Sequence, residues 1–387
     1  MSEFDDIRPY NDSEVPAVIA RLIASSEFID LLLSRRAPLL AKICPWLLRP
    51  LLRRTLSKAA KNMRTVADLQ SYLTVSLKAL VDKTTDGFSF SGLEKLDPKK
   101  SYLFLSNHRD IAMDPAMVNL ALIESGMDTL RIAIGDNLLS KPFAADLMRV
   151  NRSFIVKRNI SGRREKLTEL KKLSAYIRHS IVQDGVSIWI AQREGRAKDG
   201  QDRTETALLK MLALSKDKDQ SFAQASSELA MVPVSISYEY DPCDVDKGRE
   251  LFATQNGRDY IKQEFEDLDT IQKGLVGYKG RVHVAFGDEF SDELSDGLES
   301  PDKLSAAIDQ QIYSQYKLFP SNIIAYQMLG KTEGLERAKQ LWPDCDWADI
   351  QASFQSRLNA APRDYRSIIT QSYAAPVDNY LQATQGC

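Results

Sequence analysis

Paired cysteines are missing from this chain, and basic residues are scarce at its start. The four cysteines, Cys44, Cys243, Cys345 and Cys387, form no C-x-x-C pair, which argues against a disulfide framework or a redox motif. The acidic start, Met1 to Asp6, is the opposite of the basic region that opens a signal peptide. We therefore expect a cytoplasmic protein with reduced thiols.

Long apolar runs and an excess of charge of either sign are also lacking. No run approaches the roughly 18 to 20 apolar residues that span a bilayer, so any membrane contact should be peripheral, at the cytoplasmic face. The 51 basic and 53 acidic residues nearly cancel, which argues against a nucleic-acid partner. With 387 residues, 43% of them hydrophobic, the chain is long enough to fill a sizeable globular core.

The N-terminal part, Asp12 to Lys83, has apolar residues at helical spacing and prolines at 38, 45 and 50, which predicts several short helices. Within it, Leu31 to Arg64 carries nine basic residues and no acidic one, interleaved with leucines and Trp46. Apolar side chains can enter the acyl boundary of a membrane while nearby cations are attracted to anionic headgroups. We expect this stretch to bind an anionic membrane surface. The alternative is a helical hairpin with a packed leucine face and a solvated basic face.

From Gly87 onward, short β-rich runs alternate with helical stretches, which is typical of an α/β fold. The predicted strands are Phe88 to Phe90, Tyr102 to Leu105, Leu130 to Ile134, Ser153 to Val156, Val186 to Ala191, Val232 to Tyr240 and Val282 to Phe286. The predicted helices include Pro115 to Ile123, Arg163 to Val182, Thr204 to Leu214, Leu304 to Tyr316 and Leu335 to Leu341.

This pattern predicts three regions. Residues 1–86 form a helical membrane-binding module, and residues 87–290 form an α/β core whose central mixed sheet is flanked by helices. Residues 291–387 form a helical C-terminal extension, and a polar insertion at Asp241 to Lys279 separates the last two strands of the core.

Histidine is scarce, and only one of the three histidines lies in a turn. His179 falls in a helical run and His283 in an alternating strand, so both are most simply structural, and no cluster of histidine and cysteine suggests a metal site. His108 follows a strand and precedes a helix expected to start at Asp114-Pro115, with Asp114 as N-cap. Ligands usually bind at such turns in α/β proteins.

An imidazole in this turn can act as a general base if a carboxylate holds its other nitrogen. Asp110 and Asp114 are both candidates for that partner. The simpler reading makes Asp114 only a helix cap and His108 only a backbone-bonding loop residue. The string His108-Arg109-Asp110 imitates a kinase catalytic loop, but position 115 is proline where that motif needs asparagine, so we reject a kinase.

The segment Asn107 to Asp114 resembles a motif of the phospholipid and glycerol acyltransferase family. Members of that family carry an N-H-x-x-x-x-D motif early in an α/β core. Five residues rather than four separate His108 from Asp114, which an extra residue in the turn explains. Three further blocks follow in the family's order. They are Ser153 to Arg158, Ile188 to Arg196, which is similar to the F-P-E-G-T-R block, and Val232 to Ile236.

The resemblance implies an O-acyltransferase in which neutral His108 deprotonates an acceptor hydroxyl for attack on an acyl thioester. By the same resemblance, Asp114 orients the imidazole, with Asp110 as the other candidate, and no cofactor is required. It implies a substrate-binding set that includes phosphate-binding arginines. The members of that set are Asn107, Lys157, Arg158, Glu194, Gly195 and Arg196.

The acyl donor that the resemblance implies is acyl-CoA or acyl carrier protein. The acceptor that it implies is a lysophospholipid, and 1-acyl-glycerol-3-phosphate is the first choice. A different lyso- or non-phosphate acceptor is an alternative, and so is a non-catalytic peripheral lipid-binding protein. A lipid hydrolase is disfavoured because the chain has no G-x-S-x-G elbow.

Overall fold

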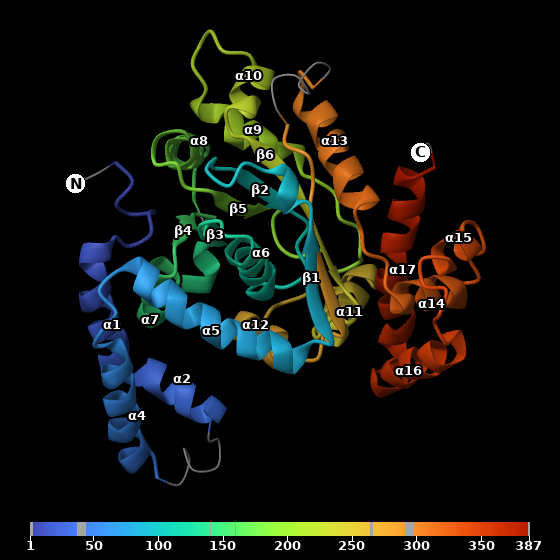
Figure 1. Cartoon of the computed structure of the whole chain (residues 1–387), viewed down its shortest axis with the longest axis horizontal. Helices are drawn as coiled ribbons and strands as arrows, with labels where there is room; N and C mark the ends of the chain where they lie inside the picture. Colours follow the sequence, from blue (N-terminus) through green and yellow to red (C-terminus); the bar gives the residue numbers. More distant parts are fainter. Residues whose placement is uncertain are drawn as a thin grey trace. The chain divides into compact units, whose positions relative to one another are not determined.

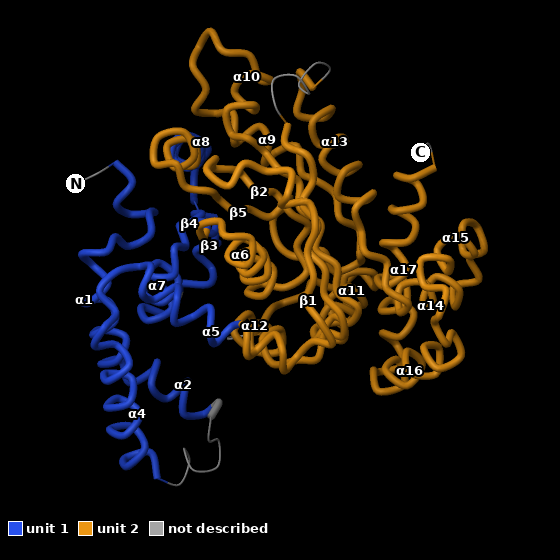
Figure 2. Tube along the Cα trace, in the orientation of Figure 1, with its two compact units in different colours: residues 1–77, 130–176 blue, residues 78–129, 177–387 orange. Residues whose placement is uncertain are grey.

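The structure, a computed structural model, describes residues 3–36, 44–139, 141–158, 160–263, 266–290 and 298–385. It divides into two compact units, residues 1–77 with 130–176 and residues 78–129 with 177–387 (Figure 2). We call these unit 1 and unit 2. Two helices, α5 (Val66–Thr84) and α8 (Arg163–Arg178), run across the boundary between the units in the sequence.

Unit 2 is built on a mixed sheet in which the strands run in the order β1-β7-β6-β2-β5. The pairs β1–β7, β6–β2 and β2–β5 are parallel, whereas β6–β7 is antiparallel. The strands are β1 (Gly87–Ser91), β2 (Leu103–Ser106), β5 (Ile188–Ala191), β6 (Met231–Tyr238) and β7 (Arg281–Phe286). Every residue of β2 and β6 is buried, as expected for central strands covered by helices on both faces.

The helices of unit 2 fall into three groups along the chain (Figure 1). Those between the strands are α6 (Met113–Glu124), α9 (Thr206–Leu212) and α10 (Phe222–Ser227). The polar insertion folds into α11 (Asp244–Gln255) and α12 (Glu266–Val276). The C-terminal extension comprises α13 (Pro301–Ser314), α14 (Pro320–Met328), α15 (Leu335–Lys339), α16 (Trp347–Ala360) and α17 (Arg366–Ala383).

The C-terminal extension has its own buried core, which explains why it is a folded part of unit 2 rather than a tail. All but two residues of α14 are buried, and α17 buries eleven of its side chains. Between α16 and α17, the rings of Phe354 and Tyr373 meet edge to face with centroids 5.1 Å apart. In Figure 1, α14, α16 and α17 lie together as one helical group.

Unit 1 combines N-terminal helices with a short parallel pair of strands. Its strands are β3 (Arg131–Gly135) and β4 (Ser153–Val156), and its helices are α1 (Val15–Ala24), α2 (Ser26–Arg36), α4 (Pro45–Ala60) and α7 (Pro142–Val150). One apolar cluster joins Val15, Val18 and Leu22 of α1 to Phe143 of α7.

The seven predicted strands are all present, and the α/β fold class with a mixed sheet and helical ends is confirmed. Three details were wrong. Pro50 lies inside α4 instead of ending a helix, and the helix expected to Val182 ends at Arg178, where a π-turn, His179–Gln183, takes over. The third concerns the helix after His108, which begins at Met113, before Asp114. The predictions for Pro38 and Cys387 lie outside the described residues.

Candidate active site

The candidate site forms where the parallel strands β2, β5 and β6 end on one edge of the unit 2 sheet. Asn107 and His108 follow β2 directly, and the segment after β5 runs alongside them. The amide of Gln192 donates to the carbonyl of Ser106 over 2.8 Å, and the amide of Ala197 donates to the carbonyl of His108 over 2.9 Å. The sheet therefore brings two of the sequence blocks, at 107–114 and 188–196, together.

His108 is paired with Asp114. Its Nδ1 lies 2.8 Å from Asp114 Oδ2, and that oxygen also accepts from the backbone amides of Arg109 (2.6 Å) and Asp110 (2.9 Å). The Asp114 side chain is fully buried, whereas the His108 side chain is 12% exposed. Since a carboxylate only accepts, this contact fits Nδ1 carrying the proton and leaves Nε2 to take one.

Aromatic and phenolic side chains hold this pair in place. The Trp189 ring of β5 meets the His108 ring edge to face at 5.4 Å, and its Nε1 donates to Ser106 Oγ over 3.0 Å. On the other side, Tyr238 of β6 donates its hydroxyl to Asp114 Oδ1 over 2.8 Å. Burial, followed by the charges of Asp114 and Asp110, raises the pKa of Tyr238 well above its ordinary value, so it stays a donor.

Asp110 plays a different part from Asp114. Its Oδ1 accepts from the backbone amides of Ala112 (3.0 Å) and Met113 (2.9 Å), which satisfies the first free amides of α6. The side chain that caps this helix is thus Asp110 and not Asp114, and this explains why α6 begins earlier than predicted. Burial and the neighbouring Asp114 charge raise the pKa of Asp110.

Asn107 is fully buried, and its side chain forms hydrogen bonds with Ile236 and Asp202. Its Oδ1 accepts from the amide of Ile236 (2.7 Å), while its Nδ2 donates to the carbonyl of Ile236 (3.0 Å) and to Asp202 Oδ2 (3.1 Å). These bonds tie the end of β2 to β6. The structure therefore places Asn107 as a support of the turn, whereas the sequence predicted contact with substrate.

Arg109, beside His108, forms a buried ion pair with Asp202. Its Nη2 lies 2.5 Å from Asp202 Oδ2, and the Tyr316 hydroxyl donates to the same oxygen. Burial works to lower the pKa of Arg109, but the charge of Asp202, together with smaller contributions from Tyr316, Asp241 and Asp114, outweighs burial and raises the pKa. Because Tyr316 follows α13, this pair links the histidine turn to the C-terminal extension.

The segment Glu194-Gly195-Arg196 follows β5, on the edge that carries His108. Glu194 is exposed, and Gly195 adopts φ +74°, a left-handed conformation that favours glycine, with open space where a side chain would stand. Nη1 of Arg196 is buried without a hydrogen-bond partner among the described residues, although its charge helps to lower the pKa of Asp241.

Lys157 and Arg158 belong to unit 1, where they follow β4. Lys157 pairs with Asp6 (2.7 Å) and Glu169 (3.0 Å), and these carboxylates raise its pKa, the bond to Asp6 most strongly. The amide of Arg158 donates to Asp136 over 3.3 Å.

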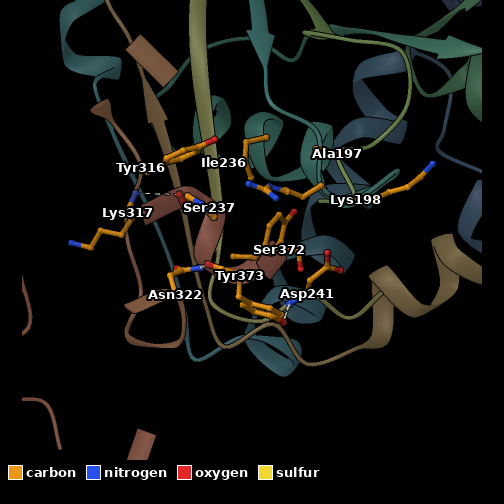
Figure 3. A pocket seen from close by; sticks show the side chains of 13 residues that line it. Ala197, Lys198, Ile236, Ser237, Asp241, Tyr316, Lys317, Asn322, Ser372 and Tyr373 are labelled. Carbon is orange, nitrogen blue, oxygen red and sulfur yellow. Dashed lines mark hydrogen bonds between the residues drawn. The ribbon is translucent and has the colours of Figure 1, made fainter. Parts of the chain in front are cut away.

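A small cavity lies beside Arg109, and Figure 3 shows the side chains that line it. Half of its wall comes from the core and half from the C-terminal extension, and His108 is not among the residues that line it. The lining residues are Arg109, Ala197, Lys198, Ile236, Ser237, Tyr238, Asp241, Tyr316, Lys317, Asn322, Ser372, Tyr373 and Pro376.

Four residues of this site were missed in the sequence. Asp202, Tyr238, Lys247 and Tyr316 come from segments far from His108, and no local pattern marks them. Tyr238 lies in a predicted element, the strand Val232 to Tyr240, but nothing local distinguishes it from the other residues of that strand. In the described part of the chain, no group of three histidine, cysteine or acidic side chains could hold a metal ion.

Comparison with known proteins defines the class of this chain. A family model described as Acyltransferase matches residues 87–237, which run from β1 through nearly all of β6 and include the whole His108 turn. Residues 87–237 are thus an acyltransferase domain, which confirms the resemblance to the phospholipid and glycerol acyltransferases, and the enzyme class that this match supports is an O-acyltransferase.

Among solved structures, one similar chain is the 1-acyl-sn-glycerophosphate (LPA) acyltransferase PlsC from Thermotoga maritima. The two share 15% sequence identity over 74% of this chain and 94% of that chain, with a TM-score of 0.35. No curated protein matches the sequence.

Proposed function

We propose that this acyltransferase moves a fatty acyl group from an acyl thioester to a glycerol hydroxyl of a lysophospholipid, 1-acyl-glycerol-3-phosphate being the first choice. The donor is acyl-CoA or acyl carrier protein, and no further cofactor is needed. The observation that carries the proposal is the 2.8 Å contact between His108 Nδ1 and Asp114 Oδ2, which leaves Nε2 available as a base.

In the proposed reaction, His108 is the only group of the protein that carries a proton. Nε2 takes the proton from the acceptor hydroxyl while the oxygen attacks the thioester carbonyl, and Asp114 stabilises the imidazolium that forms. The tetrahedral intermediate then collapses, the carbon–sulfur bond breaks, and the imidazolium returns the proton to the leaving thiolate. The products are an ester and a free thiol, without an acyl-enzyme.

A phosphate on the acceptor has a matching group in Arg196. Its Nη1 is buried and keeps a donor that no described residue uses, and guanidinium groups match phosphate by charge-assisted, forked hydrogen bonds. Arg158 is the second phosphate ligand by resemblance, with Lys157 beside it. Gly195, which has no side chain, lets the acceptor approach the backbone next to Arg196.

Helix α4 supports binding to an anionic membrane. One of its faces packs Leu48, Leu52 and Leu56 against α2. This packing corresponds to the helical hairpin with a packed leucine face that the sequence also allowed. The other face exposes Trp46 (73%), Leu47 (54%) and Leu51 (60%) near the start of the helix. The exposed cations Arg54 and Lys58 continue the stripe of Leu47 and Leu51 at helical spacing. Apolar insertion and headgroup attraction therefore act from one face.

A membrane-spanning helix is absent from the part of the chain that the structure describes. From the exposed apolar and basic face of α4, we propose that the enzyme binds the cytoplasmic face of a membrane peripherally, with α4 as the contact, and takes the lysophospholipid from that membrane.

The test incubates the chain with acyl-CoA or acyl carrier protein and a mixed lysolipid pool, follows thiol release, and identifies the new ester by mass spectrometry. His108→Ala should abolish turnover, while the far-UV circular dichroism spectrum and the thermal unfolding curve stay unchanged. His179→Ala, in the π-turn after α8, is the matched control and should keep full activity. Equal turnover of His108→Ala and wild type would show that the proposed mechanism is wrong. A product without phosphate would show that the proposed acceptor is wrong.

A further inference from the structure

Lys247, on α11, is a buried lysine that contacts the backbone of the His108 turn. Its side chain is 6% exposed, and its Nζ donates to the carbonyl of Arg109 over 2.7 Å. The same ammonium pairs with Asp241. A buried lysine needs such partners, but the backbone contact goes beyond what charge neutralisation requires.

The contact matters because it falls on one particular peptide group. The carbonyl of Arg109 and the amide of Asp110 belong to the same planar trans peptide, so they point in opposite directions. Lys247 binds the carbonyl, and Asp114 Oδ2 accepts from the amide over 2.9 Å. This peptide is held between the lysine and the carboxylate that contacts His108, and its orientation is fixed from both ends.

The C-terminal extension holds the segment that carries the partner of Lys247. The Tyr373 hydroxyl of α17 accepts from the amide of Asp241 (2.8 Å) and contacts Asp244 Oδ2 (3.1 Å). Arg357 of α16 donates to the carbonyl of Asp241 and to Asp244 Oδ2, both over 2.7 Å. Asp241 and Tyr373 both stand in the wall of the cavity (Figure 3).

We infer that Lys247 is a positioning residue for the His108–Asp114 pair, and that α16 and α17 of the C-terminal extension keep it in place. This inference rests on the proposed role of His108. Lys247 touches no reacting atom. It acts by holding the Arg109–Asp110 peptide, whose amide helps to fix Asp114 Oδ2 and therefore the direction of the imidazole.

The main variant is Lys247→Met combined with Asp241→Asn, which removes the ammonium without leaving a buried carboxylate unpaired. Its matched control is Lys273→Met with Asp246→Asn, an ion pair of 2.7 Å between α12 and α11, whose two side chains form no hydrogen bond or ion pair with the His108 turn among the described residues. We expect kcat of the main variant to fall on the order of tenfold to a hundredfold with acceptor KM unchanged. The control should match wild type.

A second readout separates positioning from folding. With ¹⁵N-labelled histidine, the Nδ1 proton of His108 in its bond to Asp114 should give an NMR signal that weakens or shifts in the main variant only. Unchanged kcat and an unchanged signal in a folded main variant would overturn the inference. If that variant does not fold, Tyr373→Phe replaces it, with a several-fold loss of kcat expected and an unchanged kcat counting against the inference.

The two proposals fail in different ways. If His108→Ala stays active, the proposed base is wrong, yet the NMR signal still reports whether Lys247 positions the imidazole. If His108→Ala is inactive and the Lys247 variant matches wild type in both readouts, only the positioning role fails.

Discussion

Tyr238 donates its hydroxyl to Asp114 Oδ1 over 2.8 Å, on the oxygen opposite the one that contacts His108. The carboxylate is thus held by a phenol on one oxygen and by two backbone amides on the other. A carboxylate with this many donors has one orientation available, so the imidazole it contacts is oriented too.

Tyr238→Phe tests this relationship. The variant removes one buried hydrogen bond, which is worth about 1.4 kcal/mol and corresponds to about a tenfold loss of kcat if it acts on the oriented pair. Thiol release at saturating donor and acceptor measures it. Tyr240→Phe, two residues further on, should keep the wild-type rate, because the Tyr240 hydroxyl makes no hydrogen bond within the part of the chain that the structure describes. Equal rates in all three proteins would show that Tyr238 is only a core residue.

Replacing each aspartate separately distinguishes the two candidate partners of His108. Asp114→Asn should lower kcat by about a thousandfold or more, because an amide neither selects the same tautomer nor stabilises the imidazolium. Asp110→Asn should be mild, since an asparagine oxygen still accepts from the amides of Ala112 and Met113. A crippled Asp110→Asn beside a nearly normal Asp114→Asn would reverse the assignment.

Asn107→Ala should cost stability. The change leaves the buried amide and carbonyl of Ile236 without their partner, which is worth roughly 3 kcal/mol of unfolding free energy. Urea denaturation followed by tryptophan fluorescence measures the loss. Asn256→Ala, in the exposed cap of α11, should cost under about 1 kcal/mol. A fully stable Asn107→Ala with a raised acceptor KM would instead favour the substrate contact.

Membrane binding should depend on the exposed stripe of α4. Arg54→Gln with Lys58→Gln removes two cations, each worth about 1 kcal/mol at an anionic surface, so partitioning into anionic vesicles should fall more than tenfold. Trp46→Ser with Leu51→Ser should weaken binding to anionic and neutral vesicles alike. Val75→Ser, 73% exposed on α5, is the control. Sedimentation with vesicles that is the same for all variants would exclude α4 as the contact.

Acid should destabilise unit 2 through His283. This ring lies between Ser89 Oγ (2.8 Å) and Ser91 Oγ (3.2 Å), and burial, with a smaller effect of Lys317, lowers its pKa from 6.5 to about 4. The neutral ring is the stable one, so its contribution is complete above about pH 6.5 and is lost as the pH falls toward 4. The wild-type unfolding free energy should drop across this window more steeply than that of His283→Gln, and parallel curves would refute the assignment.

The strands of both units were predictable because a buried strand is a local property. Each predicted run of three to nine residues rich in β-branched or aromatic side chains became a strand, with ends that moved by at most two residues. The β5 strand begins only at Ile188 because Gly185, at φ +65°, and the following turn precede it. The polar insertion showed no such pattern, and its two helices, α11 and α12, were not foreseen.

Which aspartate contacts His108 and which caps α6 was not predictable, since Asp110 and Asp114 both lie near His108 in the sequence. The choice depends on the turn geometry, in which Asp110 faces the free amides of α6 and Asp114 faces the imidazole and Tyr238. Asn107 shows the same limit. Its place beside His108 suggested substrate contact, whereas its side-chain amide forms hydrogen bonds with the backbone of Ile236 on the neighbouring strand β6.

The sequence by itself determined the α/β class, the seven strands, and the turn in which His108 stands with an acidic partner, because each depends on residues within a few positions of one another. Only the tertiary structure decided which carboxylate contacts the imidazole and which residues hold that carboxylate. Four residues reach the turn from about 90 to 210 residues away, brought there by sheet pairing and by helix packing. Tyr238 lies on β6 and Lys247 on α11, whereas Asp202 and Tyr316 lie in segments between such elements. Asp114 therefore has a local partner on one oxygen, His108, and on the other oxygen a partner that the sheet supplies, Tyr238.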